Sequence, residues 1–274
     1  VALINSEIQI TRKVIEALPE LKVIAKYSNG VDNIDVEAAT ENNVFVANVP
    51  DYCTDEVASH TLALILTLSR KIPSLNQSVK QGRWSFDEAG PLHRFNTQMV
   101  GLISYGSIAR NLTQKLQAIG FQVIAYDPVF QNSDQTSDVE LVSLEELMRS
   151  SDVISIHAPL LKETHHLIDK KMLQLVKPNA VIVNAGRGPI INEADLIDAL
   201  QEGKISGAGL DVLENEPVDI NNPLLSMENV IITPHAAFFS EESMQELKDK
   251  TMLNVLDVLE GGKPRYLVNP QVEL

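Results

Sequence analysis

The chain has 274 residues, 44% of them hydrophobic, which is enough for two domains with separate cores. Its formal net charge of −15 argues against nucleic acid or an anionic membrane as partner, because either would select a basic face. The longest apolar run, Thr61 to Leu68, is too short to cross a bilayer, and the single cysteine, Cys53, excludes an intrachain disulfide framework. A cytoplasmic protein is expected.

The first part of the chain is expected to form a small α/β unit. Short apolar runs predict strands over residues 3–4, 22–25 and 44–47, with helices over about residues 11–18 and 35–42 between them. The chain begins without Met and almost directly in a strand, so we expect that an earlier strand-helix-strand of roughly 30 or more residues is absent. A long apolar helix is predicted next, over residues 55–70.

The middle of the chain alternates apolar runs with amphipathic helices. Six runs are too apolar to face water and predict buried parallel strands over residues 100–103, 123–126, 153–156, 180–183, 207–210 and 230–232. Ser143 and Glu146 have the spacing of a capping box, and Asn192 precedes a helix that ends at Gly203. This alternation predicts a doubly wound α/β sheet.

A last helix, beginning at Ser240 and ending at Gly261 and Gly262, is predicted to return the chain to the first unit. The fold class is therefore α/β with two Rossmann-like or flavodoxin-like domains. We expect the larger domain, residues 53–238, to be inserted into a smaller one formed by residues 1–52 and 239–274.

A glycine-containing turn joins the first buried strand of the larger domain to its helix. Such a turn lets a pyrophosphate approach the N terminus of the helix. In the frame G-x-G-x-x-G, Gly106 is the second glycine, whereas Ser104 and Ala109 replace the first and third. Serine is expected to strain the turn, and on its own the motif fits an ordinary strand-helix turn equally well.

Asp127 ends the next predicted strand, 21 residues after Gly106. That spacing is close to the roughly 20 residues expected for the acid that binds the adenosine ribose. A carboxylate there would repel a 2′-phosphate, and no arginine follows it, so NAD is predicted rather than NADP. The alternative is a solvated aspartate in a turn before Pro128.

Three later segments each place a polar side chain beyond a buried strand, namely Arg187, Glu216 and His235. Ligands of open α/β sheets bind at the carboxyl ends of strands, so this coincidence favours a site over three separate surface residues. Arginine binds carboxylates bidentately, histidine transfers a proton to an adjacent oxygen, and a neighbouring glutamate favours the imidazolium. These three residues are predicted to catalyse the reduction of a 2-oxo acid by hydride transfer.

With these motifs the chain resembles the D-isomer-specific 2-hydroxyacid dehydrogenases over essentially its whole length. This family includes D-lactate, glyoxylate/hydroxypyruvate and phosphoglycerate dehydrogenases and the C-terminal-binding-protein corepressors. The resemblance is carried by residues 27–35, 49–57 and 268–270. It implies that Arg187 and His235 bind the substrate, with His235 as the acid/base and Glu216 as its partner. It also implies that the turn at Asn29 and Gly30 contacts the substrate carboxylate.

The resemblance further implies contacts to NAD throughout the larger domain. The implied residues are Gly106, Ser107, Ile108, Asp127, His157, Ala158, Pro159, Ala185, Gly186, Arg187, Asp211, His235, Ala237 and His60. Asp211 matches the residue that faces the nicotinamide carboxamide. His157 could equally be a satisfied strand-end histidine, and His60 a residue of helix packing. His165 and His166 are expected to be solvated, and no metal site is expected.

Departures from the family and its variable positions limit the prediction of the substrate. Ser28 stands where many members have glycine. Phe238 and Phe239 resemble the aromatic pair of D-lactate dehydrogenases and the corepressors, which suits a small or apolar 2-hydroxy or 2-oxo acid. The alternatives are a phosphoglycerate dehydrogenase and, from another class, an NAD(H)-sensing corepressor-like protein. A homodimer with Trp84 buried in its interface is also expected.

Overall fold

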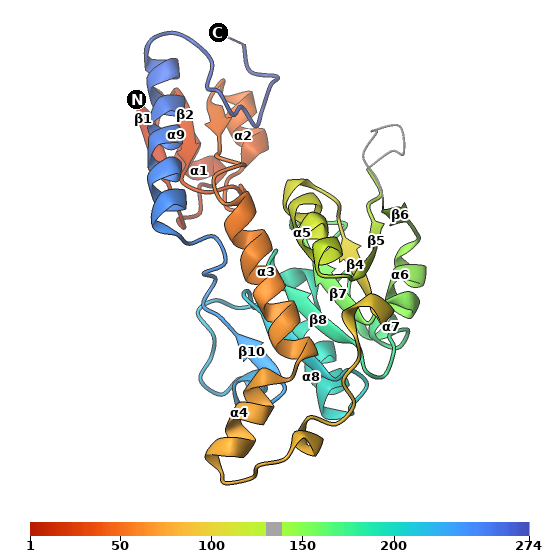
Figure 1. The fold of residues 1–274 in the computed structure, drawn as a ribbon. Helices are drawn as coiled ribbons and strands as arrows, with labels where there is room; N and C mark the ends of the chain where they lie inside the picture. Colours follow the sequence, from red (N-terminus) through yellow and green to blue (C-terminus); the bar gives the residue numbers. More distant parts are fainter. Residues whose placement is uncertain (130–138, 274) are drawn as a thin grey trace. The chain divides into compact units, whose positions relative to one another are not determined.

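The computed structural model describes residues 1–129 and 139–273 and divides the chain into two compact units (Figure 1). One unit comprises Val1–Cys53 and Phe238–Leu274, and the other comprises Thr54–Ala237. The chain thus leaves the first unit, forms the whole of the second and returns through its last long helix. The inserted domain predicted from the sequence covers residues 53–238.

The smaller unit has a three-stranded parallel sheet in the order β1-β2-β3. The strands are Ala2–Asn5, Val23–Lys26 and Phe45–Ala47, and the helices are α1 (Arg12–Glu16), α2 (Val36–Glu41) and α9 (Glu241–Leu259). Side chains of β2 alternate between the faces, with Ile24 in the cluster that contains Ile15 of α1 and Val23 beside Val258 of α9. Both faces of the sheet are therefore covered, which accounts for the apolar run over residues 23–25 of β2.

The larger unit contains, among the described residues, a seven-stranded parallel sheet in the order β10-β9-β8-β7-β4-β5-β6. The strands are β4 (Met99–Ile103), β5 (Gln122–Tyr126), β6 (Glu140–Leu141), β7 (Val153–Ile156), β8 (Val181–Asn184), β9 (Gly207–Leu210) and β10 (Val230–Ile232). The order reverses between β4 and β7, so the sheet is doubly wound, with its switch point there. All six predicted strands are present, and β6 is an addition.

Helices cover both faces of this sheet. The α-helices are α3 (Thr54–Ser69), α4 (Ile72–Lys80), α5 (Ser107–Ala118), α6 (Leu144–Ser150), α7 (Lys170–Leu173) and α8 (Glu193–Gln201). Short 3-10 helices span Phe86–Ala89, Phe95–Thr97, Gly188–Ile190 and Pro223–Ser226. Helices α3 and α5 share one apolar cluster with the sheet, whereas α6, α7 and α8 share another. In the described part of the chain, no helix combines the length and apolarity needed to cross a membrane.

The predicted helix starts are largely correct. Asn192 caps α8 through the Asp195 N–H, and Ser240 caps α9 in a full capping box with Ser243. Ser143 caps α6 by accepting from the Glu146 N–H, so the predicted N-cap is correct. The helix predicted over residues 11–18 is shorter, at Arg12–Glu16; its C-cap is Ala17, and Pro19 lies in a turn beyond it.

Candidate active site

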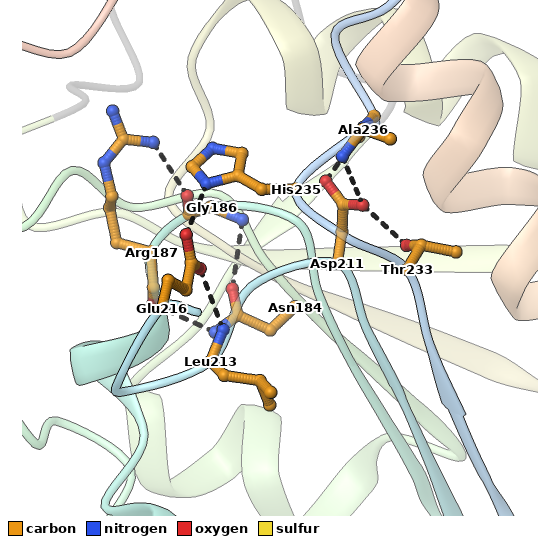
Figure 2. A network of polar contacts seen from close by, with 10 residues as sticks. Asn184, Gly186, Arg187, Asp211, Leu213, Glu216, Thr233, His235 and Ala236 are labelled. Atoms are coloured by element: carbon orange, nitrogen blue, oxygen red, sulfur yellow. Dashed lines mark hydrogen bonds and ion pairs between the residues drawn. The ribbon is translucent and has the colours of Figure 1, made fainter. Parts of the chain in front are cut away.

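The three residues predicted as catalytic lie together at one edge of the larger sheet. Arg187 follows β8, Glu216 lies in the loop after β9 and His235 follows β10, and these strands are neighbours in the sheet. Because the strands are parallel, their carboxyl ends meet at the same edge. Figure 2 shows the imidazole of His235 beside the Glu216 carboxylate, with Arg187 next to the pair.

His235 and Glu216 form an ion pair in which Nδ1 lies 2.8 Å from Oε2. The other carboxylate oxygen of Glu216 accepts a hydrogen bond from the Leu213 N–H at 3.0 Å. Burial alone would raise the pKa of Glu216, but these two hydrogen bonds and the charges of His235 and Arg187 lower it below its usual value. Glu216 therefore remains a carboxylate that orients the imidazole, with Nε2 on the opposite edge of the ring.

The loop that carries Arg187 is shaped by its neighbours. The buried Asn184 accepts from the Gly186 N–H through Oδ1 and donates to the Arg187 carbonyl through Nδ2, both at 3.0 Å. A Cβ atom at Gly188 would lie 1.8 Å from the Leu213 carbonyl oxygen, so only glycine allows the two loops to meet. The guanidinium of Arg187 donates to the Gly186 carbonyl at 2.9 Å.

The turn that carries His235 is in a left-handed conformation, with φ of 52° at His235, which residues other than glycine adopt infrequently. Asp211, whose side chain is 1% exposed, stabilises this turn through hydrogen bonds. Its carboxylate oxygens accept the N–H groups of Ala236 and Ala237, each at 2.9 Å, and its carbonyl accepts the His235 N–H at 2.8 Å. Asp211 thus fixes the backbone on which the imidazole stands, a role that the sequence did not suggest.

The turn expected to bind the cofactor precedes α5. Gly106 is the N-cap of α5, and a Cβ atom placed on it would meet nothing within 4 Å, so the space before the helix N terminus is open to a pyrophosphate. Ser107 and Ile108 form the first turn of this helix. Ser104 has φ of 72°, which confirms the strain expected from a serine at this position. The residues present therefore fit a dinucleotide.

Asp127 follows β5 and is bound to the same turn. Its Oδ2 accepts from the Tyr105 N–H at 2.8 Å and from the Ser104 hydroxyl at 3.2 Å, and its Oδ1 accepts from the Val129 N–H at 2.9 Å. Donors from the chain therefore hold the carboxylate beside the glycine turn, where the fold places the adenosine ribose.

His157 lies at the end of β7, ahead of the buried Ala158 and the exposed Pro159. Its Nε2 is 2.9 Å from the Ser155 hydroxyl. Desolvation of the ring lowers the pKa of His157 from 6.5 to about 4, so the imidazole is neutral at neutral pH.

The neutral state of His157 predicts a pH dependence of stability. The unfolded chain binds a proton at this ring near pH 6.5, whereas the folded chain does so only near pH 4. Stability is therefore intact above about pH 6.5 and is lost as the pH falls toward 4, by about 2 kcal/mol at about pH 5. Urea unfolding at about pH 7.5 and 5 should show this loss in the wild type and a smaller loss in His157→Gln. Equal losses in the two proteins would contradict the assignment.

The predicted substrate turn lies in the smaller unit. The Asn48 side chain donates to the Asn29 carbonyl at 2.7 Å, and the Ser28 hydroxyl donates to the Gly30 carbonyl at 3.1 Å. The serine that departs from the family pattern thus fixes the turn through its hydroxyl.

The expectation that His165 and His166 are both solvated is wrong for His166. His166 has φ of 53°, and its Nε2 lies 2.9 Å from Oε1 of Glu214, whereas His165 is exposed. Glu214 also exchanges hydrogen bonds with Glu193, each at 3.0 Å, so this network anchors the loop that carries Glu216. Within residues 1–129 and 139–273, no cluster of acidic, histidine or cysteine side chains could hold a metal ion.

A doubly wound sheet with an open glycine turn, an acid at the end of the next strand and an ion-paired histidine defines the class of nicotinamide-nucleotide dehydrogenases. Residues 62–237 match the family model described as the NAD-binding domain of the D-isomer specific 2-hydroxyacid dehydrogenases. The chain belongs to this family, as its sequence motifs suggested, and it is an NAD-dependent oxidoreductase of 2-hydroxy acids.

Curated relatives and solved structures agree with this assignment. The chain is 35% identical to a glyoxylate reductase of Thermococcus litoralis, over 96% of the chain and 82% of that protein. It is 39% identical to a D-3-phosphoglycerate dehydrogenase of Methanocaldococcus jannaschii, over 98% of the chain but only 51% of that protein. The structure of a D-lactate dehydrogenase from Aquifex aeolicus, complexed with NAD and lactic acid, superposes with a TM-score of 0.91 at 30% identity, covering 98% of this chain and 86% of that one.

Proposed function

We propose that the protein reduces a small, unphosphorylated 2-oxo acid to the D-2-hydroxy acid, with Arg187, Glu216 and His235 as its catalytic residues. The observation that carries the proposal is the 2.8 Å pair of His235 and Glu216 beside Arg187, at the edge of the sheet where ligands of this fold bind. The glyoxylate reductases and the hydroxypyruvate reductase among the relatives support a substrate of this size.

Each residue of the trio has one task. The guanidinium of Arg187 binds the substrate carboxylate and polarises the adjacent carbonyl. His235, oriented by Glu216, donates a proton to the carbonyl oxygen, and in the reverse direction it accepts the hydroxyl proton. NADH supplies, when bound, the hydride that reduces the carbonyl carbon.

The remaining site residues are proposed as binding residues. The helix N terminus at Gly106, Ser107 and Ile108 would bind the pyrophosphate, and Asp127 the adenosine ribose. The family resemblance alone supports Asn29 and Gly30 for the substrate carboxylate. It supports a further set for the rest of the cofactor: His157, Ala158, Pro159, Ala185, Gly186, Arg187, Asp211, His235 and Ala237. For His60 the resemblance implies the same role, which is the alternative to a positioning role.

A panel of 2-oxo acids tests the proposal. Purified protein and NADH are mixed with glyoxylate, hydroxypyruvate, pyruvate, phosphohydroxypyruvate and longer 2-oxo acids, and the loss of NADH absorbance is followed. We expect the highest kcat/KM with one of the small unphosphorylated acids. Preference for phosphohydroxypyruvate would instead favour a phosphoglycerate dehydrogenase, the activity named for the Methanocaldococcus jannaschii relative. Tight NADH binding without turnover of any acid would favour a corepressor-like binding protein.

Asp127 is proposed to select NADH over NADPH. Asp127→Ser removes the charge that repels a 2′-phosphate and keeps a hydrogen-bonding side chain, so the preference for NADH should fall by at least about 10-fold. The measurement is kcat/KM for the two cofactors with a saturating 2-oxo acid. A wild type that uses both equally well would show that the cofactor assignment is wrong.

We further propose that the protein is a cytoplasmic homodimer in which Trp84 is buried. In the single chain Trp84 is 88% exposed and Phe86 is 85% exposed, in the segment after α4. Large exposed aromatic side chains of this kind are typical of protein interfaces. Sedimentation of the purified protein solely as a species of one 30.2 kDa chain would contradict the dimer.

A further inference from the structure

A chain of hydrogen bonds connects helix α3 to the turn that carries His235. In α3, Nε2 of His60 lies 3.0 Å from the Thr233 hydroxyl oxygen, which lies 2.6 Å from Oδ1 of Asp211. The Asp211 carboxylate in turn accepts the Ala236 and Ala237 N–H groups. Figure 2 shows the Thr233 and Ala236 ends of this connection meeting at Asp211.

The chemistry of the three groups fixes the direction of these bonds. The Asp211 carboxylate can only accept, so the single hydroxyl proton of Thr233 is donated to it at 2.6 Å. The Thr233 oxygen is then an acceptor for the His60 ring, so Nε2 of His60 carries a proton. His60 Nε2 also lies 3.6 Å from Oδ1 of Asp211, which adds a second attraction toward the same carboxylate.

This arrangement matters because His235 has a left-handed backbone conformation. That conformation is uncommon at residues other than glycine, and surrounding contacts stabilise it. Here the enforcing group is a nearly fully buried carboxylate, which needs donors on all sides to keep its position. His60 is 26% exposed at its side chain, so it closes the solvent-facing end of the connection.

We propose that His60 is a positioning residue that holds Asp211 in place through Thr233 and thereby orients His235 for proton transfer. This inference rests on the proposed function, since it concerns the same histidine. It differs from the role in cofactor binding that the family resemblance implies for His60, because a phosphate contact would act on NADH affinity, whereas positioning of His235 acts on turnover.

Substitutions at residue 60 separate the two roles. His60→Leu keeps a side chain of similar bulk without a donor, and we expect kcat to fall by about 5- to 10-fold, the effect of one lost hydrogen bond. The dissociation constant of NADH, measured by fluorescence titration, should stay within about twofold of the wild type. His60→Gln restores a donor near the position of Nε2 and should recover most of kcat. Ser59→Ala, on the exposed side of the same helix, is the matched control and should behave as wild type.

A double-mutant cycle tests whether the effect passes through Thr233. Thr233→Val keeps the shape but removes the hydroxyl, and we expect a loss of kcat at least as large as that of His60→Leu. In the Thr233→Val background, His60→Leu should cause almost no further loss, because the connection is already broken. Multiplied losses in the double variant would overturn the proposal, as would a wild-type kcat in His60→Leu.

Hydrogen exchange gives a readout that does not depend on turnover. In His60→Leu and Thr233→Val, the Ala236 and Ala237 amides should exchange faster than in the wild type, with other amides of the larger unit unchanged. Unchanged exchange at these two amides would overturn the positioning role. If the wild type turned over none of the 2-oxo acids while these amides responded as expected, the proposed function would fail and the structural connection would stand.

Discussion

Replacing Arg187 by leucine should abolish the reduction of 2-oxo acids, with kcat/KM lowered by at least about 10³-fold. Leucine fills similar space but cannot bind a carboxylate, and a charge-assisted bidentate pair in a partly enclosed site contributes several kcal/mol to binding of the transition state. The backbone of residue 187 should stay in place, because Asn184 and Gly188 shape the loop without the guanidinium. Most of the NADH affinity should therefore remain.

Two further variants make the Arg187 experiment decisive. Arg187→Lys keeps the charge but cannot bind the carboxylate bidentately, so its activity should lie between those of the wild type and Arg187→Leu. Arg149→Leu removes an exposed arginine at the end of α6 and should leave kcat/KM unchanged. Activity in Arg187→Leu close to that of Arg149→Leu would remove Arg187 from the site.

Replacing His235 by alanine should lower kcat by about 10²- to 10⁴-fold, the range typical of a lost general acid. The fold should survive, because the turn is held by the backbone contacts of Asp211. Steady-state rates with NADH and the best acid of the panel measure the effect.

The left-handed backbone at His235 calls for a second substitution in this experiment. Alanine disfavours that conformation, so part of its effect could come from a moved turn. Asparagine tolerates left-handed φ but cannot transfer the proton, and His235→Asn should therefore lose as much activity as His235→Ala. A loss of only about twofold in the asparagine variant would refute proton transfer by this residue.

The sheet and the grouping of the three proposed catalytic residues were predictable because they depend on local patterns. A buried parallel strand must be apolar along its whole length, and parallel strands end at the same edge, so Arg187, Glu216 and His235 could be placed together from their strands alone. Strand β6 escaped prediction because it comprises only Glu140 and Leu141, which is too short to show a period.

The parts that sequence patterns missed depend on contacts between distant loops. In the sequence, nothing distinguishes Gly188 from the other glycines. Only the close approach of the Leu213 carbonyl in the structure shows why glycine is required there. The ring of His166 contacts Glu214, 48 residues later in the chain. This contact depends on a left-handed backbone conformation at His166, which the neighbouring sequence does not predict. Thr233 and Asp211 likewise have no local signature for the hydrogen bond that joins them.

The close approach of the Leu213 carbonyl to Gly188 also limits how the sequence of the site can evolve. Because the loops after β8 and β9 touch backbone to backbone there, neither loop can be lengthened or redirected without moving the other. Natural variants and designed libraries should therefore alter substrate preference through residues outside these two loops. The relative positions of Arg187, Glu216 and His235 would then be kept together in related proteins, while the residues around them vary.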